Sequence, residues 1–210
     1  GGSRRKPWIF MFAVIMVAAM STLWIAKPGS GTGTLILILA AFVIATAAAE
    51  FATVFTNSMM PTLVPPDGLG KLSGTGYAVG YAGGLASLVI MAGLIVSNPV
   101  TGKTLLGLDP LIALNAAERE GDRLVGPFAA IWFALFMIPF FLFVPDVKPT
   151  HAHDKGRSAL AELWSTVKSL PQQPNMLMFL LARMIYVDGL SAIFTFGGIY
   201  GTAVFGWTAF

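Results

Sequence analysis

Three charged side chains stand inside long apolar stretches of this 210-residue sequence. Glu50 lies in residues 34–55, and Arg183 and Asp188 lie in residues 176–200. A charge at membrane depth is tolerated mainly where it faces the interior of a helix bundle or a water-filled path. These three residues are therefore the first candidates for a substrate or proton pathway.

Arg183 and Asp188 point to a helix that is interrupted inside the membrane. The two residues are five positions apart, about 140° around an α-helix, so their side chains do not share one face. Gly189 follows Asp188 directly and loosens the backbone there, as expected for the broken helices with which secondary transporters expose polar groups to cargo. Asp188 would then carry a proton or contact cargo. The alternative is that Asp188 caps the resumed helix and Arg183 snorkels to the membrane surface.

Glu50 lies beyond the midpoint of its stretch, toward the end that we assign to the cytoplasm. An unpaired carboxylate in lipid would cost a few kcal/mol. Glu50 is therefore expected to face the bundle interior or the cytoplasmic mouth. Two roles stay open for it there: a charge network with basic residues of the cytoplasmic loops, or substrate binding.

Membrane-spanning helices must position these residues. An α-helix needs about 20 residues to cross the hydrocarbon core, and five apolar stretches approach or exceed that length: residues 8–26, 34–55, 72–96, 127–144 and 176–200. The mean hydropathy is +0.76 and only 11% of residues are charged, against about 25% in a soluble domain. The sequence predicts an all-α fold, a polytopic membrane helix bundle with five main transmembrane spans.

Several other functions are not supported by the sequence. The net charge of +3 is small and gives no reason to expect nucleic-acid binding. The absence of cysteine excludes thiolate metal sites and cysteine nucleophiles within the chain. His151 and His153 lie in a short polar segment that lacks further metal ligands, and we find no catalytic set of side chains. We expect no metal, no cofactor and no enzymatic activity.

The distribution of basic residues predicts the orientation of the chain. With the N-terminus in the cytoplasm, the inside segments hold eight Lys and Arg residues and the outside segments hold four. Cytoplasmic loops carry the excess of Lys and Arg in membrane proteins. We therefore expect a multi-pass membrane protein whose residue 1 lies on the cytoplasmic side.

Small residues predict where helices approach closely. Residues 34–55 carry alanines at the helical spacing of one face: Ala41, Ala45, Ala48, Ala49 and Ala52. In residues 72–96, glycines recur every four positions, with one more beside the last: Gly76, Gly80, Gly83 and Gly84. We expect this glycine ridge to face another helix. A hinge surface in a moving transporter is the alternative.

Proline and glycine predict the ends of the helices. The prolines and glycines of residues 59–71 are expected to stop one helix before the next begins. Pro127 predicts a helix start, Pro139 predicts a kink, and residues 111–119 predict a short surface helix. Residues 146–175 predict a cytoplasmic linker that contains an amphipathic helix. This helix lies either on the inner membrane surface or against cytoplasmic loops.

The sequence resembles the major facilitator superfamily of transporters. Its opening Gly2-Ser3-Arg4-Arg5-Lys6-Pro7-Trp8 resembles the basic tail of the loop between helices 2 and 3 of that superfamily. Other runs are similar to the vacuole-effluxer-like family within it: Asn57-Ser58-Met59-Met60-Pro61, residues 73–84, and Ala182-Arg183-Met184-Ile185-Tyr186-Val187-Asp188-Gly189. These runs add Asn57 and Tyr186 to the candidate pathway residues, and Arg4, Arg5 and Lys6 form the cytoplasmic basic motif.

This resemblance implies a fragment that covers roughly helices 3 to 7 of a twelve-helix transporter. Residues 1–145 would complete the N-terminal six-helix half, residues 146–175 would form the central linker, and residues 176–210 would begin the C-terminal half. Fungal members of the family are vacuolar amino-acid effluxers, so the resemblance implies the vacuolar membrane for a fungal protein and the cell (inner) membrane for a bacterial one.

The sequence and the resemblance together favour a secondary active transporter that works by alternating access. Its partners would be the lipid bilayer and a small-molecule cargo, namely amino acids or similar small metabolites, with or without coupled protons. The oligomeric state stays open. The alternative function is a non-transporting membrane scaffold or assembly subunit, in which the intramembrane charges only hold helices together.

Overall fold

The computed structural model describes residues 4–98, 101–146 and 159–206. The structure is 80% helical and has no β-strand among the described residues, which confirms the all-α prediction. The chain forms two compact units, Gly1–Thr150 (unit 1) and His151–Phe210 (unit 2). Residues 147–158, which include both histidines, and Gly2 and Ser3, which precede the basic motif, lie outside the described residues.

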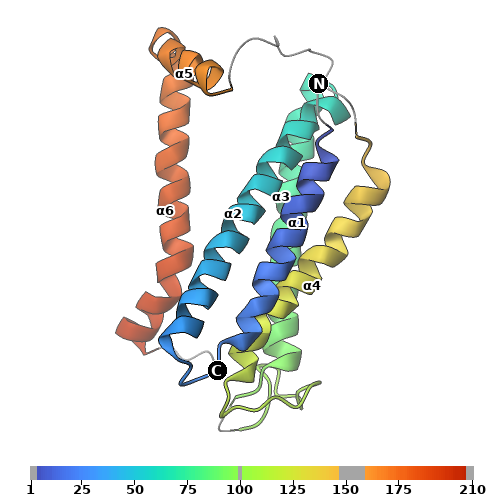
Figure 1. Ribbon diagram of the computed structural model, residues 1–210, viewed down its shortest axis with the longest axis vertical. Coiled ribbons are helices and arrows are strands. Elements are labelled where there is room, and N and C mark those ends of the chain that lie inside the picture. The colour runs from blue at the N-terminus through green and yellow to red at the C-terminus, as the bar shows by residue number, and fades with distance from the viewer. Residues whose placement is uncertain (1–3, 99–100, 147–158, 207–210) are drawn as a thin grey trace. The chain divides into compact units, whose positions relative to one another are not determined.

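Within the described residues, five helical segments are long and apolar enough to cross a membrane, as predicted. In unit 1 the long helices are α1 (Lys6–Ser21), α2 (Thr32–Leu63), α3 (Leu69–Ile90) and α4 (Glu120–Phe143). Short helical turns extend two of these spans: η1 (Thr22–Ile25) follows α1, η2 (Pro66–Gly68) precedes α3, and η3 (Met91–Ile95) follows α3. Unit 2 consists of α5 (Ala159–Ser169), η4 (Leu170–Gln172) and α6 (Pro174–Phe205). Figure 1 shows these helices by label.

One expected helix boundary is confirmed and another is wrong. Helix α2 runs through Pro61 but ends at Leu63, within residues 59–71, and α3 begins at Leu69, as expected. Helix α4 begins at Glu120, so Pro127 lies inside the helix and does not begin it. A proline keeps a helical φ and removes only one backbone donor. At α4, the Glu120 carboxylate accepts the Asn115 N–H at 2.7 Å, and acidic residues in the first turn favour an earlier start.

The short helix expected at residues 111–119 is absent, because bends and turns occupy that segment. The Asn115 side chain accepts the N–H of Ala117 at 3.0 Å, a local hydrogen bond that competes with helix formation. Arg119 then adopts a left-handed conformation, with φ 50° and ψ 39°, directly before α4.

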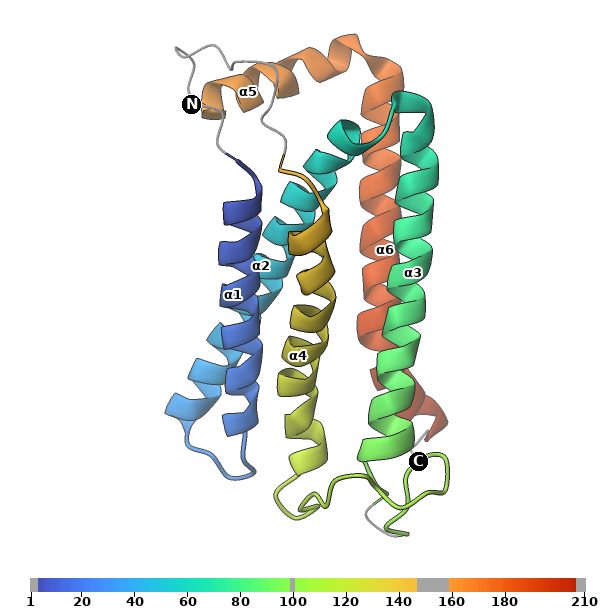
Figure 2. The same ribbon diagram turned by 90° about the vertical axis from the view of Figure 1, so that its right-hand side faces the viewer.

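Helix α1 packs against both α2 and α4 in unit 1. As predicted, α2 makes its contact through the alanine face: Ala41, Ala45, Ala48 and Ala52 are buried. Aromatic rings extend this contact toward the N-terminal end of α1. The Phe12 ring of α1 stacks on the Phe51 ring of α2, with centroids 5.0 Å apart. In Figure 2, α3 lies on the side of α4 away from α1. The core of unit 1 is therefore built around α1.

The expected helix contact of the glycine ridge is not made within unit 1. A Cβ built on Gly76, Gly80, Gly83 or Gly84 finds no heavy atom of a neighbouring element within 4 Å. Gly76, Gly80 and Gly84 are exposed. The physical reason is that α3 makes few contacts with the other long helices of unit 1, so its glycine-bearing surface stays open.

Gly126 provides the closest helix approach, and sequence inspection missed it. A Cβ at Gly126 would lie 2.5 Å from the Met20 carbonyl oxygen and 2.7 Å from the Leu23 Cβ. Replacing Gly126 by Ala is expected to destabilise the protein by about 1–3 kcal/mol, because the α1–α4 contact must open to admit the methyl group. Thermal unfolding of the full-length protein in detergent measures this effect.

The matched control is Gly74→Ala, which changes a glycine of α3 that has open space around it. This variant is expected to unfold at the same temperature or slightly higher, because alanine has the better helix propensity. Equal destabilisation by both changes would contradict the close approach at Gly126.

Helix α6 of unit 2 is continuous, so the predicted break at Gly189 is wrong. An interior glycine costs a helix only about 1 kcal/mol relative to alanine. A break at membrane depth would leave backbone groups without partners, each at a cost of several kcal/mol. The continuous helix therefore has the lower free energy. It also removes the alternative role of Asp188 as a helix cap, since Asp188 lies inside α6, whose N-cap is Gln173.

Helix α5 confirms the helix predicted within the linker. Its apolar residues Leu163, Trp164 and Val167 are exposed, and the Lys168 ammonium lies 5.6 Å from the centroid of the Trp164 ring. An apolar face of this kind suits the membrane surface, and that placement stays a prediction.

Candidate functional site

A polar face runs along α2 opposite its alanine face. Thr46, Glu50, Thr53 and Asn57 follow one another at steps of four, three and four residues, which places them on one side of the helix. Glu50 is about 180° around the helix from Ala41 at 100° per residue. All four polar side chains are exposed. Helix α2 therefore uses one face for packing and leaves the other for polar contacts inside the membrane.

Glu50 makes no ion pair and no hydrogen bond through its side chain among the described residues. The charge network expected for it is therefore not found in this part of the chain. Arg5 and Lys6, two basic residues of unit 1, donate to backbone carbonyls instead. Arg5 reaches α2 only at the Ser58 carbonyl, eight residues or about 12 Å beyond Glu50 along the helix.

Asn57 offers two polar groups at one position. Its side chain is exposed on the same face as Glu50. Pro61 has no N–H, so the Asn57 carbonyl also loses the donor that it would have in a regular α-helix. A carbonyl released in this way inside a membrane needs another partner, such as water or a bound molecule.

A cavity of about 650 Å³ opens beside Asn57, between α2, α3 and α4. Its polar lining residues are Thr53, Thr56, Asn57, Ser73, Tyr77 and Tyr81. Gly76 and Gly80 also line it, so part of the glycine ridge borders the cavity, where the absence of side chains leaves room. Small-molecule sites commonly have 300–1,000 Å³ and combine apolar walls with a few polar groups. This cavity fits that description.

The remaining pathway candidates lie on α6 of unit 2. Arg183, Tyr186, Asp188 and Gly189 are exposed. Because α6 is continuous, Arg183 and Asp188 lie on different faces, and the described residues include no ion pair between them. Asp188 instead shares a polar stripe with Ser191 and Thr195, at steps of three and four residues. Sequence inspection missed this stripe, although its spacing was visible.

The basic motif caps other helices at one end of unit 1. The Lys6 ammonium donates to the Phe141 carbonyl at 2.9 Å. That carbonyl has no helical donor, because residue 145 is proline. The Arg5 guanidinium donates to the Ser58 carbonyl at 2.9 Å, and the Arg5 backbone N–H donates to Asp146 Oδ1 at 3.2 Å. The motif thus joins α1 to the C-terminal ends of α2 and α4.

Comparison with known proteins agrees with this membrane architecture. Residues 67–210, from before α3 to the end of the chain, match the family model described as vacuole effluxer Atg22 like. The chain belongs to the vacuole effluxer Atg22-like family. The match includes the glycine ridge, the α3 side of the cavity and all candidate residues of α6. Glu50 and Asn57 lie before it.

Members of this family and its superfamily share modest identity with the chain. Autophagy-related protein 22 of Cryptococcus neoformans is 26% identical over 145 residues, which cover 66% of this chain and 23% of the relative. The MFS-type transporter YxiO of Bacillus subtilis is 23% identical over 176 residues, which cover 80% of this chain and 37% of the relative. The chain thus spans about a quarter to two fifths of these relatives. No solved structure matches it.

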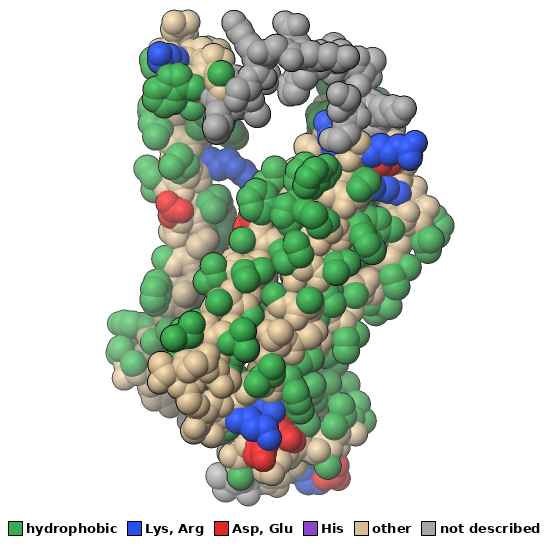
Figure 3. Space-filling view, viewed as in Figure 1, with side chains coloured by type: hydrophobic (Ala, Val, Ile, Leu, Met, Phe, Trp, Pro, Cys, Tyr) green, Lys and Arg blue, Asp and Glu red, His purple; other side chains and the backbone are tan. Residues whose placement is uncertain are grey.

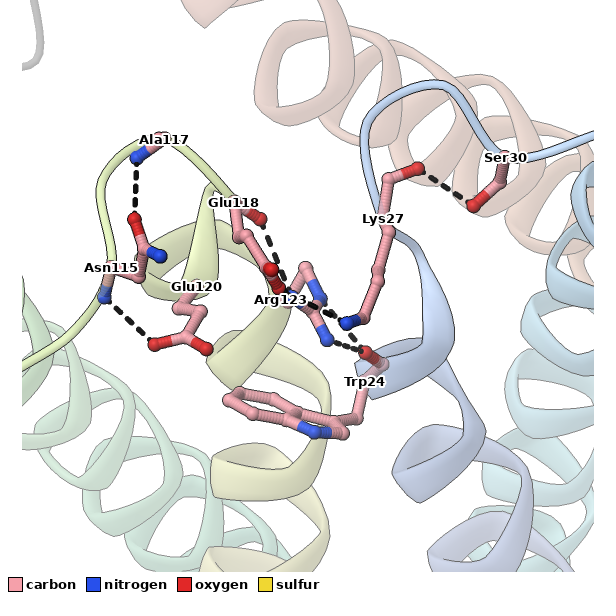
Figure 4. Close-up of polar contacts among 8 residues, drawn as sticks. All are labelled: Trp24, Lys27, Ser30, Asn115, Ala117, Glu118, Glu120 and Arg123. Atoms are coloured by element: carbon pink, nitrogen blue, oxygen red, sulfur yellow. Dashed lines mark hydrogen bonds and ion pairs between the residues drawn. The ribbon is translucent and has the colours of Figure 1, made fainter.

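The part of the chain that matches the Atg22-like family also contains a buried arginine that sequence inspection missed (Figure 4). Arg123 of α4 is 5% exposed. Its Nε and Nη2 donate to the Trp24 carbonyl at 2.8 and 2.6 Å, and its guanidinium lies 4.6 Å from the Trp24 ring centroid. Residue 28 is proline, so this carbonyl has no donor four residues later. The sequence could have indicated a carbonyl without a helical donor at Trp24 and a basic residue at Arg123. Only the fold shows that these two groups meet.

Glu118 completes the network at this end of unit 1. Its carboxylate lies 3.1 Å from Lys27 Nζ and 3.3 Å from Arg123 Nη1. The hydrogen bond and charge of Lys27, followed by those of Arg123, lower the pKa of the Glu118 carboxyl from its ordinary value. The loop before α4 is thereby tied to the turn between α1 and α2. Figure 3 shows this general arrangement on one face: hydrophobic side chains cover the middle of unit 1, and charges gather toward its ends.

Replacing Arg123 with Gln is expected to destabilise the protein by about 1–3 kcal/mol, because the Trp24 carbonyl loses both guanidinium donors. Arg123→Lys keeps the charge but loses the paired donation from Nε and Nη2, and should be intermediate. The measurement is the thermal unfolding of the full-length protein. Arg119→Gln, which removes only an exposed ion pair with Asp122, is the control and should change stability by less than about 1 kcal/mol. Equal stability of all three variants would contradict the capping role.

Proposed function

We propose that this chain is part of a secondary active membrane transporter that works by alternating access, with the polar face of α2 along its pathway. The observation that carries the proposal is Glu50, an exposed carboxylate in a membrane-spanning helix, opposite the packing face and without a partner among the described residues. Such a residue is tolerated where it faces water or a bundle interior. A transport pathway supplies that environment.

The cargo class that we propose is amino acids or similar small metabolites. The family description names a vacuole effluxer, and a bacterial relative is named as an MFS-type transporter. The cavity beside α2 supports a cargo of this size, and its amide, hydroxyl and phenol groups can donate to a carboxylate and accept from an ammonium group. Glu50 and Asp188 are the carboxylates that would carry protons in a coupled mechanism; an uncoupled mechanism needs only their polarity.

The proposal includes a setting for the protein. The N-terminal end of α1 faces the cytoplasm, and the membrane is the vacuolar one in a fungus or the cell membrane in a bacterium. The proposed domain division keeps residues 1–145 in the N-terminal half, residues 146–175 in the linker and residues 176–210 in the C-terminal half. No enzymatic step is assigned, and the names of the relatives describe none.

The alternative function, a scaffold that does not transport, is less well supported. In a scaffold the intramembrane charges would hold helices together through ion pairs. The described part of the chain shows ion pairs only among residues outside the middle of the spans, and none that includes Glu50, Arg183 or Asp188.

Water access to the polar face of α2 tests the proposed pathway. Thr46 and Ile44 differ by two positions, about 3 Å in depth, but their faces are about 160° apart. Single-cysteine variants Thr46→Cys and Ile44→Cys would be made in the full-length protein with its other cysteines replaced. We expect a membrane-impermeant maleimide to label Thr46→Cys in membrane vesicles and not Ile44→Cys. Equal labelling of both variants, or labelling of neither, would contradict a water-filled path along this face.

A further inference from the structure

A second groove of unit 1, between α1 and α4, differs from the cavity beside α2 because its lining is wholly apolar. It has a volume of about 610 Å³ and is lined by eleven residues, all Ala, Val, Ile, Leu, Met or Phe. Val14 and Val17 of α1 and Phe133 and Met137 of α4 are among them. A groove without a single polar side chain cannot orient a polar cargo. It can accommodate a hydrocarbon chain.

One end of this groove lies beneath the basic motif. Phe10 and Phe141 line the groove, with ring centroids 5.6 Å apart. The Lys6 ammonium is bonded to the Phe141 carbonyl at 2.9 Å, so it stands at the rim of the groove. Arg4 and Arg5 directly precede Lys6. The three positive charges of this motif are opposed by the one negative charge of Asp146, which accepts the Arg5 N–H.

Donors remain available at this rim. Lys6 has three N–H donors and uses one on Phe141. Arg5 has five side-chain donors and uses one on Ser58. Arg4 is exposed and makes no hydrogen bond or ion pair within the described ranges. A phosphate oxygen is the kind of acceptor that such groups bind best.

We propose that the α1–α4 groove and its basic rim hold one anionic glycerophospholipid. An acyl chain occupies the groove, and the phosphate lies against Arg4 and Lys6. The net positive charge favours a headgroup with net negative charge over a zwitterionic one, because juxtamembrane Lys and Arg attract anionic lipids. This inference does not rest on the proposed transport function, since it concerns a different surface of unit 1.

Lipid retention by the full-length protein tests this inference. The protein would be incubated with vesicles of equal parts phosphatidylglycerol and phosphatidylcholine, purified in detergent, and examined by native mass spectrometry. We expect one retained phosphatidylglycerol in preference to phosphatidylcholine. Arg4→Gln should weaken this retention about fivefold, the factor expected for one basic residue near a membrane surface. Arg4 makes no contact that folding needs, so this variant should remain folded.

A pair of groove variants distinguishes the groove from general lipid adhesion. Val14→Trp fills the groove with an indole, and Ile131→Trp places the same ring on an exposed site of α4 that does not line the groove. We expect Val14→Trp to lose the retained lipid and Ile131→Trp to keep it, with both proteins eluting as folded species in size-exclusion chromatography. Equal retention of both lipids by the unmodified protein would overturn the proposal, as would retention that Val14→Trp leaves unchanged.

Discussion

Replacing Glu50 with Gln is expected to reduce cargo flux at least tenfold while leaving the protein as stable as before. Glu50 has no described partner whose loss would destabilise the fold, so removing its charge should change the free energy of unfolding by less than about 0.5 kcal/mol. A carboxylate that faces lipid would cost a few kcal/mol, and one that faces a water-filled path avoids that cost, so a role in transport accounts for both the charge and the small expected change in stability. Flux in proteoliposomes and thermal unfolding of the same preparation measure both quantities.

Asp109→Asn is the matched control for Glu50→Gln. Asp109 is also a carboxylate, but it lies in the loop after α3, 84% exposed, and pairs only with Lys103. This control is expected to transport normally. Normal flux by Glu50→Gln with lower thermal stability would return Glu50 to the structural role that the sequence left open, and would remove the main support for the pathway along α2.

Replacing Asp188 with Asn is expected to abolish flux, or its dependence on pH, without affecting membrane insertion. Asp188 lies inside a continuous α6 and shares a polar stripe with Ser191 and Thr195, so it has no capping bond to lose. Flux measured over a range of pH separates the two roles: loss of the pH dependence alone indicates a proton carrier, and loss of flux at every pH indicates a cargo contact. Asp188→Glu keeps the carboxylate and should retain part of the flux.

Unchanged flux of Asp188→Asn at every pH tested would eliminate Asp188 from the pathway. The broken helix, which first suggested a role for this residue, is not seen in α6. The case for Asp188 therefore depends on its charge at membrane depth and on the polar stripe, and this variant tests both.

The helices of this protein could be predicted from sequence because the membrane imposes a simple rule. Each span needs a long apolar stretch, and each backbone group needs a partner inside the span. That rule located all five helices, and the spacing of Ala41 to Ala52 correctly located the packing face of α2. The same rule explains why a single proline or glycine does not end a helix: α2 runs through Pro61, α4 through Pro127 and α6 through Gly189. The cluster of prolines and glycines in residues 59–71 does separate α2 from α3, as expected.

The contacts between helices were harder to predict, because they depend on which surfaces meet. The glycine ridge of α3 looked like a packing surface, yet within unit 1 it borders open space and the cavity. The close approach at Gly126 has no repeating pattern, since one glycine opposite Met20 is sufficient. Arg123 donates to the Trp24 carbonyl, which lies 99 residues away in the sequence. The spacing of neighbouring residues cannot predict such a contact.

The candidate pathway residues stay a prediction. Charge at membrane depth identified Glu50, Arg183 and Asp188 from sequence, and the structure adds that Glu50 shares a face with Asn57 and that the cavity lies beside it. Among the described residues Glu50 forms no ion pair, and the basic motif caps backbone carbonyls. The linker residues Lys148, Lys155 and Arg157 lie outside the described residues. A proline near the end of a helix leaves a backbone carbonyl without its donor. A nearby basic side chain can therefore bind that carbonyl as well as a carboxylate.

Flux through the full-length protein in proteoliposomes tests the transport proposal most directly. Vesicles would be loaded with radiolabelled amino acids, or exposed to them, with and without an imposed pH gradient. The account predicts movement of at least one amino acid or similar small metabolite above that of protein-free vesicles, and loss of this movement in Glu50→Gln. Absence of flux for every such compound, in either direction and with either gradient, by protein that is folded and inserted, would contradict it.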